Sequence, residues 1–149
     1  MKINIQNISK TNLKIDTGKL KIYSKEILAE LGEKIVSLNI VLVNNEYIKK
    51  LNLKYRKINR ATDILAFNAD KEKDLNEGNE KELGDIAISL EIANLQSKIF
   101  KNSFEKEVIL LLTHGILHLL GHDHGTKKDE EKMNSLQKEL MDKYYKNKD

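Results

Sequence analysis

The sequence contains no cysteine. Disulfide bonds, iron–sulfur clusters and thiol nucleophiles are therefore excluded, and any bound metal must be held by imidazole or carboxylate groups. Long apolar runs are also missing, because the longest one, residues 108–112, falls far short of the roughly 20 residues that a membrane-spanning helix needs. The first ten residues lack the apolar core and cleavage site of a secretory signal. We therefore expect a cytoplasmic protein with no membrane partner.

Arginine is scarce as well. Of the 26 basic residues only Arg56 and Arg60 are arginines, and both fall within one five-residue window. The formal net charge of +3 is too small to indicate nucleic-acid binding by itself. Arginine differs from lysine because its planar fork matches the geometry of a phosphate group. We therefore treat this window as a candidate functional site.

The 149 residues, 40% of them hydrophobic, fit one globular domain covering residues 1–149. Hydrophobic patterning predicts mixed helices and strands. Strands are predicted near residues 3–8, 37–43, 63–67 and 84–89. Helices are predicted to begin after Asp16 or Thr17, after Asn44 or Asn45, at Leu90, at Ser103 and after Thr126. The charged stretch 70–82 predicts a hairpin loop, and hence antiparallel pairing of the two strands beside it.

The helix predicted over residues 103–120 carries the most chemistry. His114 and His118 stand four residues apart, a spacing that puts both imidazoles on one helix face. Gly121 can end the helix in a left-handed conformation and turn the chain, so that His124 returns to the pair. Three protein nitrogens leave a tetrahedral zinc ion with one open position, as in catalytic sites. We predict one zinc ion per chain, bound by these three histidines.

Two residues of the same segment have alternative interpretations. His122 lies beside the turn, and we expect it to be exposed instead of serving as a ligand or as a hydrogen-bond partner of one. Asp123 either caps the turn after Gly121 or orients one of the imidazoles. The sequence leaves both alternatives for Asp123 open.

The histidine spacing matches the metalloprotease pattern HExxHxxGxxH, with one exception. The residue after the first histidine is Gly115, whereas the proteases have a glutamate there that acts as the general base. The match therefore supports a metal site more than it supports proteolysis.

The run HGILHLLGHDH at residues 114–124 resembles the metal motif of the YbeY family of bacterial rRNA maturation factors, HGxLHLxGxDH. Residues 51–67, LNLKYRKINRATDILAF, resemble the family's LNxxYRxxDxPTDVLSF segment, and LGDIAIS at 83–89 resembles its LGDI strand. Three of the departures from the pattern lie at positions outside the predicted ligands and put the rigidity of a loop in question. These positions are Asn59 for Asp, Ala61 for Pro and Ala66 for Ser.

The resemblance implies an α+β fold in which a metal-binding helix and flanking helices pack against a small four-stranded mixed sheet. It also implies a single-strand-specific endoribonuclease that acts in small-subunit rRNA maturation and ribosome quality control. The implied partners are ribosomal RNA, the small ribosomal subunit and ribosome-associated proteins. By the same comparison, Arg56 corresponds to the family's cleft arginine, and Thr62 and Asp63 correspond to residues that open the third strand.

These patterns lead to a hypothesis about roles. A zinc-bound water would attack the RNA phosphodiester, and Arg56 would clamp the scissile phosphate. The alternative for Arg56 is a surface salt bridge with Glu46 or Asp63. Arg60 is either a second phosphate contact or solvated. Asp63 and Asp85 either orient the backbone or a histidine, or simply begin strands.

Two rival functions remain open on the sequence alone. One is a zinc metallopeptidase, which the missing glutamate disfavours. The other is a non-catalytic ribosome-associated zinc protein, which the lack of a fourth protein ligand disfavours.

Overall fold

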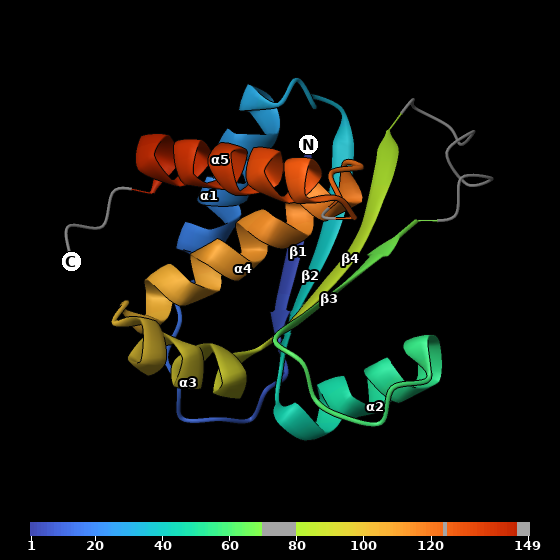
Figure 1. Cartoon of the computed structure of the whole chain (residues 1–149), viewed down its shortest axis with the longest axis vertical. Coiled ribbons are helices and arrows are strands. Elements are labelled where there is room, and N and C mark those ends of the chain that lie inside the picture. Colours follow the sequence, from blue (N-terminus) through green and yellow to red (C-terminus); the bar gives the residue numbers. More distant parts are fainter. Residues whose placement is uncertain (70–79, 124, 146–149) are drawn as a thin grey trace.

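The structure is a computed structural model that describes residues 1–69, 80–123 and 125–145. Its elements are β1 (Lys2–Asn7), α1 (Thr17–Glu30), β2 (Val36–Val43), α2 (Asn45–Arg56), β3 (Ile64–Asn68), β4 (Lys81–Ser89), α3 (Leu90–Phe100), α4 (Phe104–Leu119) and α5 (Lys127–Tyr144). Figure 1 shows α4 lying between the sheet and α5, with α2 set apart at one end of the strands. The expected α+β fold with a mixed sheet is confirmed.

The four strands are arranged in the order β1-β2-β4-β3. β2 lies parallel to both β1 and β4, whereas β3 pairs with β4 in antiparallel fashion, as the hairpin prediction required. The prediction for the start of β4 was wrong by three residues, because Lys81 already pairs with Val36 and its N–H donates to Ile35 O at 3.0 Å. Charged side chains are tolerated there because they are exposed. Residues 70–79 of the predicted loop lie outside the described residues.

Three helices start after the predicted capping residues Asp16, Asn44 and Thr126, and Ser103, which was predicted as the first residue of its helix, is the cap of α4. The side chains of Asp16, Asn44, Ser103 and Thr126 each accept a hydrogen bond from the backbone N–H three residues later, at 2.9–3.1 Å. Such bonds satisfy N–H groups that have no partner inside the helix. The sequence allowed two caps for each of the first two helices, and the structure uses Asp16 instead of Thr17 and Asn44 instead of Asn45.

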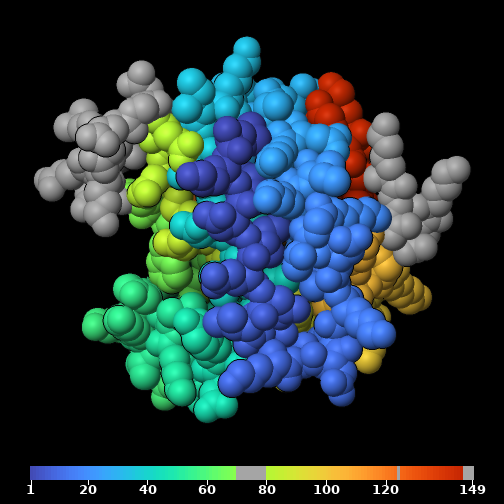
Figure 2. Space-filling view, turned by 180° about the vertical axis from the view of Figure 1, so that it is seen from behind, coloured from blue at the N-terminus to red at the C-terminus, as the bar shows by residue number. Residues whose placement is uncertain are grey.

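The main core lies between one face of the sheet and helices α1, α4 and α5. α4 is its centre, with Val108, Ile109, Leu112 and Ile116 fully buried. The opposite face of the sheet, called here the second face, carries a smaller cluster in which Ile48 of α2 packs on three strand residues. Figure 2 views the molecule from behind, with β1 in dark blue beside α1 and with α2 in green below the strands. α2 therefore covers only one end of the second face.

A buried hydrogen bond fixes the middle of α4 to α1. Thr113 Oγ1 donates to Ile109 O at 2.7 Å, so the Tyr23 hydroxyl, 2.6 Å away, must donate to Thr113. Burial raises the pKa of Tyr23 to about 12. Thr113 immediately precedes His114, so this contact also positions the histidine-bearing turn.

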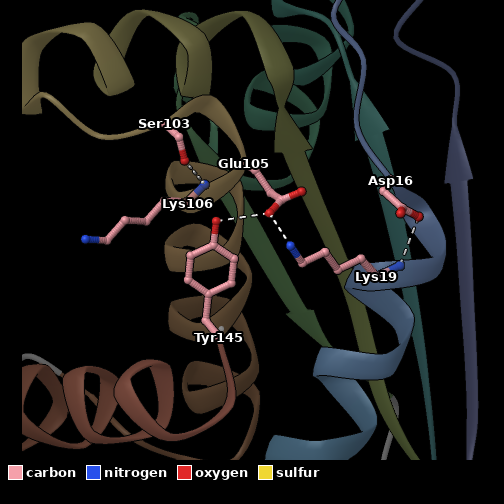
Figure 3. A network of polar contacts seen from close by, with 6 residues as sticks. All are labelled: Asp16, Lys19, Ser103, Glu105, Lys106 and Tyr145. Atoms are coloured by element: carbon pink, nitrogen blue, oxygen red, sulfur yellow. Dashed lines mark hydrogen bonds and ion pairs between the residues drawn. The ribbon is translucent and has the colours of Figure 1, made fainter. Parts of the chain in front are cut away.

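The beginning of α4 is held by a polar cluster that we call the Glu105 junction (Figure 3). Glu105 Oε1 lies 2.7 Å from Lys19 Nζ of α1 and accepts a hydrogen bond at 3.0 Å from the Tyr145 hydroxyl, just after α5. Lys19 Nζ also lies 5.3 Å from the centre of the Tyr145 ring. The hydrogen bond to Glu105 raises the pKa of Lys19. The junction joins three helices, but its partly exposed ion pair contributes little stability.

None of the helices in the described parts of the chain combines the length and the apolar character needed to cross a membrane.

Candidate functional site

A cavity of about 190 Å³ opens where α4 passes β3 and the end of α2. It is lined by Arg56, Asp63, Ile64, Ala66, His114, Gly115 and His118. Four of these residues were singled out as site candidates from the sequence, and they come from three separate segments. The fold therefore brings Arg56, Asp63, His114 and His118 together, as a single site requires.

The two histidines lie on the cavity side of α4. Both are partly buried, and the residues beside them, Leu117 and Leu119, are buried in the core. His124 falls outside the described residues, so its role as a ligand stays a prediction. Within the described residues no three histidine, aspartate or glutamate side chains form a metal-binding group. The predicted zinc site therefore requires His124 as its third ligand.

α4 ends in a glycine turn of the kind predicted. Gly121 has φ +97°, its N–H donates to His118 O at 3.1 Å, and the His122 N–H donates to Leu117 O at 3.0 Å. This pair of bonds is a Schellman motif, which glycine favours at its left-handed position. A Cβ at Gly121 would meet no atom within 4 Å, so the requirement for glycine is conformational. The chain thus turns at Gly121, three residues after His118.

This turn also corrects the expectation for His122. His122 is partly buried instead of exposed, and its backbone N–H is hydrogen-bonded to the helix end. Asp123 lies beyond the turn and is exposed.

Gly115 allows α4 to pack directly on the sheet. A Cβ at this position would lie 2.7 Å from Ile64 Cδ1 and 3.0 Å from Ile86 Cδ1. Both separations are too short for carbon atoms without displacement of the neighbours. The position that holds the general base in metalloproteases is therefore occupied by the helix–sheet contact, and a glutamate does not fit there in this arrangement.

The carboxylate that does line the cavity belongs to Asp63, at the start of β3. Its Oδ1 accepts hydrogen bonds from the Ile64 N–H at 2.8 Å and the Thr62 hydroxyl at 3.3 Å, and its Oδ2 accepts one from Gln96 Nε2 at 3.3 Å. The carboxylate is thereby oriented by β3 on one side and by α3 on the other. Sequence reasoning missed Gln96, because its partner lies 33 residues away along the chain.

Arg56 is the last residue of α2, and its side chain is exposed. Its Nη2 donates to Ala66 O at 3.5 Å, which is a long hydrogen bond. The salt-bridge alternative finds no support in the described residues, where Arg56 has no ion pair and Glu46 instead lies 3.8 Å from Lys50. The guanidinium is therefore held loosely over the edge of β3, beside the cavity.

Arg60 lies apart from this group. Its side chain is exposed and does not line the cavity, whereas its carbonyl accepts a hydrogen bond at 3.0 Å from Asn52 Nδ2. That bond ties the loop after α2 back onto the helix. The solvated interpretation of Arg60 fits this placement better than a phosphate contact.

Asp85 is not brought to the histidines. Side chains alternate between the two faces of a strand, and Ile86 of β4 faces α4. Asp85 accordingly points to the second face, where it lines a groove with Val41 and Phe67. The idea that Asp85 orients a histidine does not agree with this placement.

One further contact, between β3 and the end of α4, was not anticipated. Asn68 Nδ2 donates to Leu119 O at 3.0 Å, across 51 residues of sequence. It satisfies a carbonyl at the helix end that has no partner inside the helix. No local pattern identifies such a bond, because it exists only once the helix and strand are packed together.

Comparisons with known proteins agree with one another. The family model described as endoribonuclease YbeY matches residues 4–145. The protein named Endoribonuclease YbeY from Acholeplasma laidlawii is 35% identical over 130 residues, covering 87% of this chain and 90% of the relative. Its namesake from Acetivibrio thermocellus is 37% identical and covers 95% of each. The solution structure of TM1509 from Thermotoga maritima superposes with a TM-score of 0.61 at 27% identity, covering 98% of this chain and 93% of that one.

Proposed function

The chain belongs to the YbeY family of endoribonucleases, and we propose that it is a zinc-dependent, single-strand-specific endoribonuclease in small-subunit rRNA maturation and ribosome quality control. Family membership supports the endoribonuclease activity. The observation that carries the proposal for the site is the cavity in which Arg56 and Asp63 meet His114 and His118.

The donors in and near the cavity fit zinc. Imidazole nitrogens are favoured zinc ligands, and the chain has no thiolates that would close a structural site. We propose that His114, His118 and His124 hold one zinc ion per chain. When bound, zinc supplies Lewis-acid chemistry that activates water for attack on phosphorus.

Arg56 is suited to hold the scissile phosphate. Its fork can donate two parallel hydrogen bonds to phosphate oxygens and neutralise charge that develops there. Its 3.5 Å bond to Ala66 O is weak enough to be exchanged for a phosphate. Asp63 Oδ2 has a single long hydrogen bond, from Gln96, and so retains a lone pair for a proton of the attacking water.

The proposed partners are ribosomal RNA, the small ribosomal subunit and ribosome-associated proteins in the cytoplasm. The formal net charge of +3 gives the chain little long-range attraction for RNA. Local contacts and partner proteins would therefore determine which RNA is cut.

The rival functions are less compatible with the site. A metallopeptidase needs a general base where Gly115 packs on Ile64 and Ile86. A purely structural zinc needs a fourth protein ligand.

The test compares wild type with His118→Ala and Arg56→Ala for bound zinc and for cleavage of a single-stranded rRNA fragment, with a peptide substrate alongside. His122→Ala and Arg60→Ala are matched controls. We expect His118→Ala to lose both zinc and cleavage. Arg56→Ala should keep zinc but lose roughly 100-fold or more in cleavage, while Arg60→Ala cuts nearly as well as wild type. Zinc-loaded wild type that leaves RNA intact would refute the nuclease proposal for the isolated chain.

A further inference from the structure

The cavity is too small for a nucleotide. Its volume of about 190 Å³ lies below the roughly 300–1,000 Å³ that is usual for small-molecule sites. A phosphate group and water fit, but a base and a ribose do not. The bases next to the scissile phosphate must therefore lie on the surface around the cavity.

A larger concave surface lies on the other side of edge strand β3. We call it the aromatic groove, and its volume is about 470 Å³. It is lined by Val41, Tyr47, Leu51, Tyr55, Phe67, Asn68, Asp85, Ile86 and Ala87. Tyr55 and Tyr47 are 56% and 44% exposed, although both belong to a groove with a largely apolar floor. The rings of Tyr55 and Phe67 lie 5.0 Å apart between centroids, with their planes at 54°.

The groove and the cavity share the same strand and helix end. Phe67 follows Ala66 in β3, and the two side chains lie on opposite faces of the strand. Tyr55 likewise precedes Arg56, whose guanidinium reaches Ala66 O across the strand edge. Arg56, which would hold the phosphate, and Ala66, which it contacts, are thus each adjacent in sequence to one aromatic residue of the groove.

Charges are arranged so that bases, more than phosphates, fit the groove. Lys54 Nζ lies 5.1 Å from the Tyr55 ring centre, and Lys57 is exposed at the same helix end. Inside the groove the Asp85 carboxylate forms no hydrogen bond or ion pair with any described residue. A carboxylate repels phosphate, whereas uncharged bases can enter the groove while their phosphates stay at the lysine rim.

We propose that the aromatic groove binds nucleobases of single-stranded RNA next to the scissile phosphate, with a base stacked on Tyr55. This inference rests on the proposed nuclease function. Stacking on aromatic rings is tolerant of sequence and requires unpaired bases, so the groove would also select single strands over duplexes.

The test is steady-state cleavage of a single-stranded rRNA fragment by the zinc-loaded protein. Tyr55→Ala should raise KM about 5- to 150-fold, the equivalent of ~1–3 kcal/mol for one stacked base, with kcat nearly unchanged. Tyr55→Phe should behave like wild type. Tyr55→Leu keeps apolar volume against Phe67 without an aromatic face, and should resemble Tyr55→Ala. Phe100→Ala removes an aromatic side chain of similar exposure, 63%, on α3 outside the groove, and should leave KM unchanged.

A direct readout comes from Tyr55→Trp, because the chain contains no tryptophan. We expect RNA to quench its fluorescence, whereas RNA with an abasic site next to the cleaved bond should quench it less. Thermal unfolding of every variant separates folding defects from binding defects.

The outcomes distinguish the two proposals. If wild type neither cuts nor binds RNA, the nuclease function itself is refuted. If wild type cuts but Tyr55→Ala keeps the wild-type KM and Tyr55→Trp is not quenched, only the groove proposal is wrong. It is equally wrong if Tyr55→Ala cuts naked RNA normally but loses binding to a small-subunit protein, because the groove is then a protein-docking site.

Discussion

The two ends of α4 are built for different purposes. The start of the helix is joined to α1 and to Tyr145 after α5 through the Glu105 junction, and its middle is joined to α1 through the Tyr23–Thr113 hydrogen bond. The last turn carries two partly buried histidines beside a cavity, and is held by a glycine turn and by Asn68. A helix anchored firmly at one end can present reactive groups at the other without much loss of precision. Substitutions near the cavity should therefore affect activity most, and substitutions near the anchor should affect stability.

The largest effect expected at the cavity, apart from loss of metal, comes from Asp63→Asn. An amide oxygen still accepts the Ile64 N–H bond, so the fold should be retained, but the carboxylate that we propose as the proton acceptor is lost. We expect kcat/KM to fall about 100-fold or more, with little change in the melting temperature. The matched control is Asp142→Asn, an exposed α5 carboxylate paired with Lys138. Equal activity of both variants would contradict a catalytic role for Asp63.

Gly115→Ala should lower both activity and stability. This residue belongs both to the cavity and to the helix–sheet contact, so it does not fit the separation between cavity and anchor. The added methyl group must displace Ile64 and Ile86, and we expect a loss of about 1–2 kcal/mol in unfolding free energy even after the gain in helix propensity. Denaturant unfolding measures the loss, and cleavage should fall as well, because α4 moves away from β3. Gly18→Ala on α1 is the control and should change stability by no more than about 0.5 kcal/mol. A Gly115→Ala protein as stable as wild type would show that the contact is not tight.

Tyr23→Phe should give the smallest effect, about 1 kcal/mol of stability, through loss of a buried hydrogen bond. It also has a signature in pH. The pKa of Tyr23 is raised to about 12 from 10.0, so the unfolded chain releases this proton first as the pH rises. The contribution of Tyr23 is thus complete below pH 10 and declines between pH 10 and 12, by roughly 2 kcal/mol.

Tyr23→Phe lacks this decline, so its stability curve should meet and cross that of wild type in alkaline solution. Denaturant unfolding between pH 8 and 12 measures both curves. Tyr47→Phe, at an exposed tyrosine, should run parallel to wild type. Parallel curves for Tyr23→Phe as well would mean that Tyr23 is not buried as described.

Local patterns predicted most of this fold. Caps such as Asp16 and Ser103 and the turn at Gly121 depend on residues within one helical turn, so the sequence contains what is needed to place them. The metal motif, which is equally local, drew attention to the end of α4 that lines the cavity.

Features that depend on packing were missed or misjudged. The reason for Gly115 is the approach of two isoleucines from different strands, and Asn68 and Gln96 act on partners far along the chain. Asp85 was grouped with the histidines because strand alternation alone does not say which face meets α4. The start of β4 was placed late because exposed charges at a strand end resemble a loop.

The strand order has a consequence for how the protein is made. β3 pairs only with β4 among the described strands, and β4 enters between β2 and β3 after both have been synthesised. Pairing between strands distant in sequence is slow because a long loop must close first. The sheet therefore closes late, and the histidines of α4 are translated later still. A nascent chain that has reached β4 thus lacks the proposed zinc ligands, and it remains without nuclease chemistry until α4 and the turn that follows have left the ribosome.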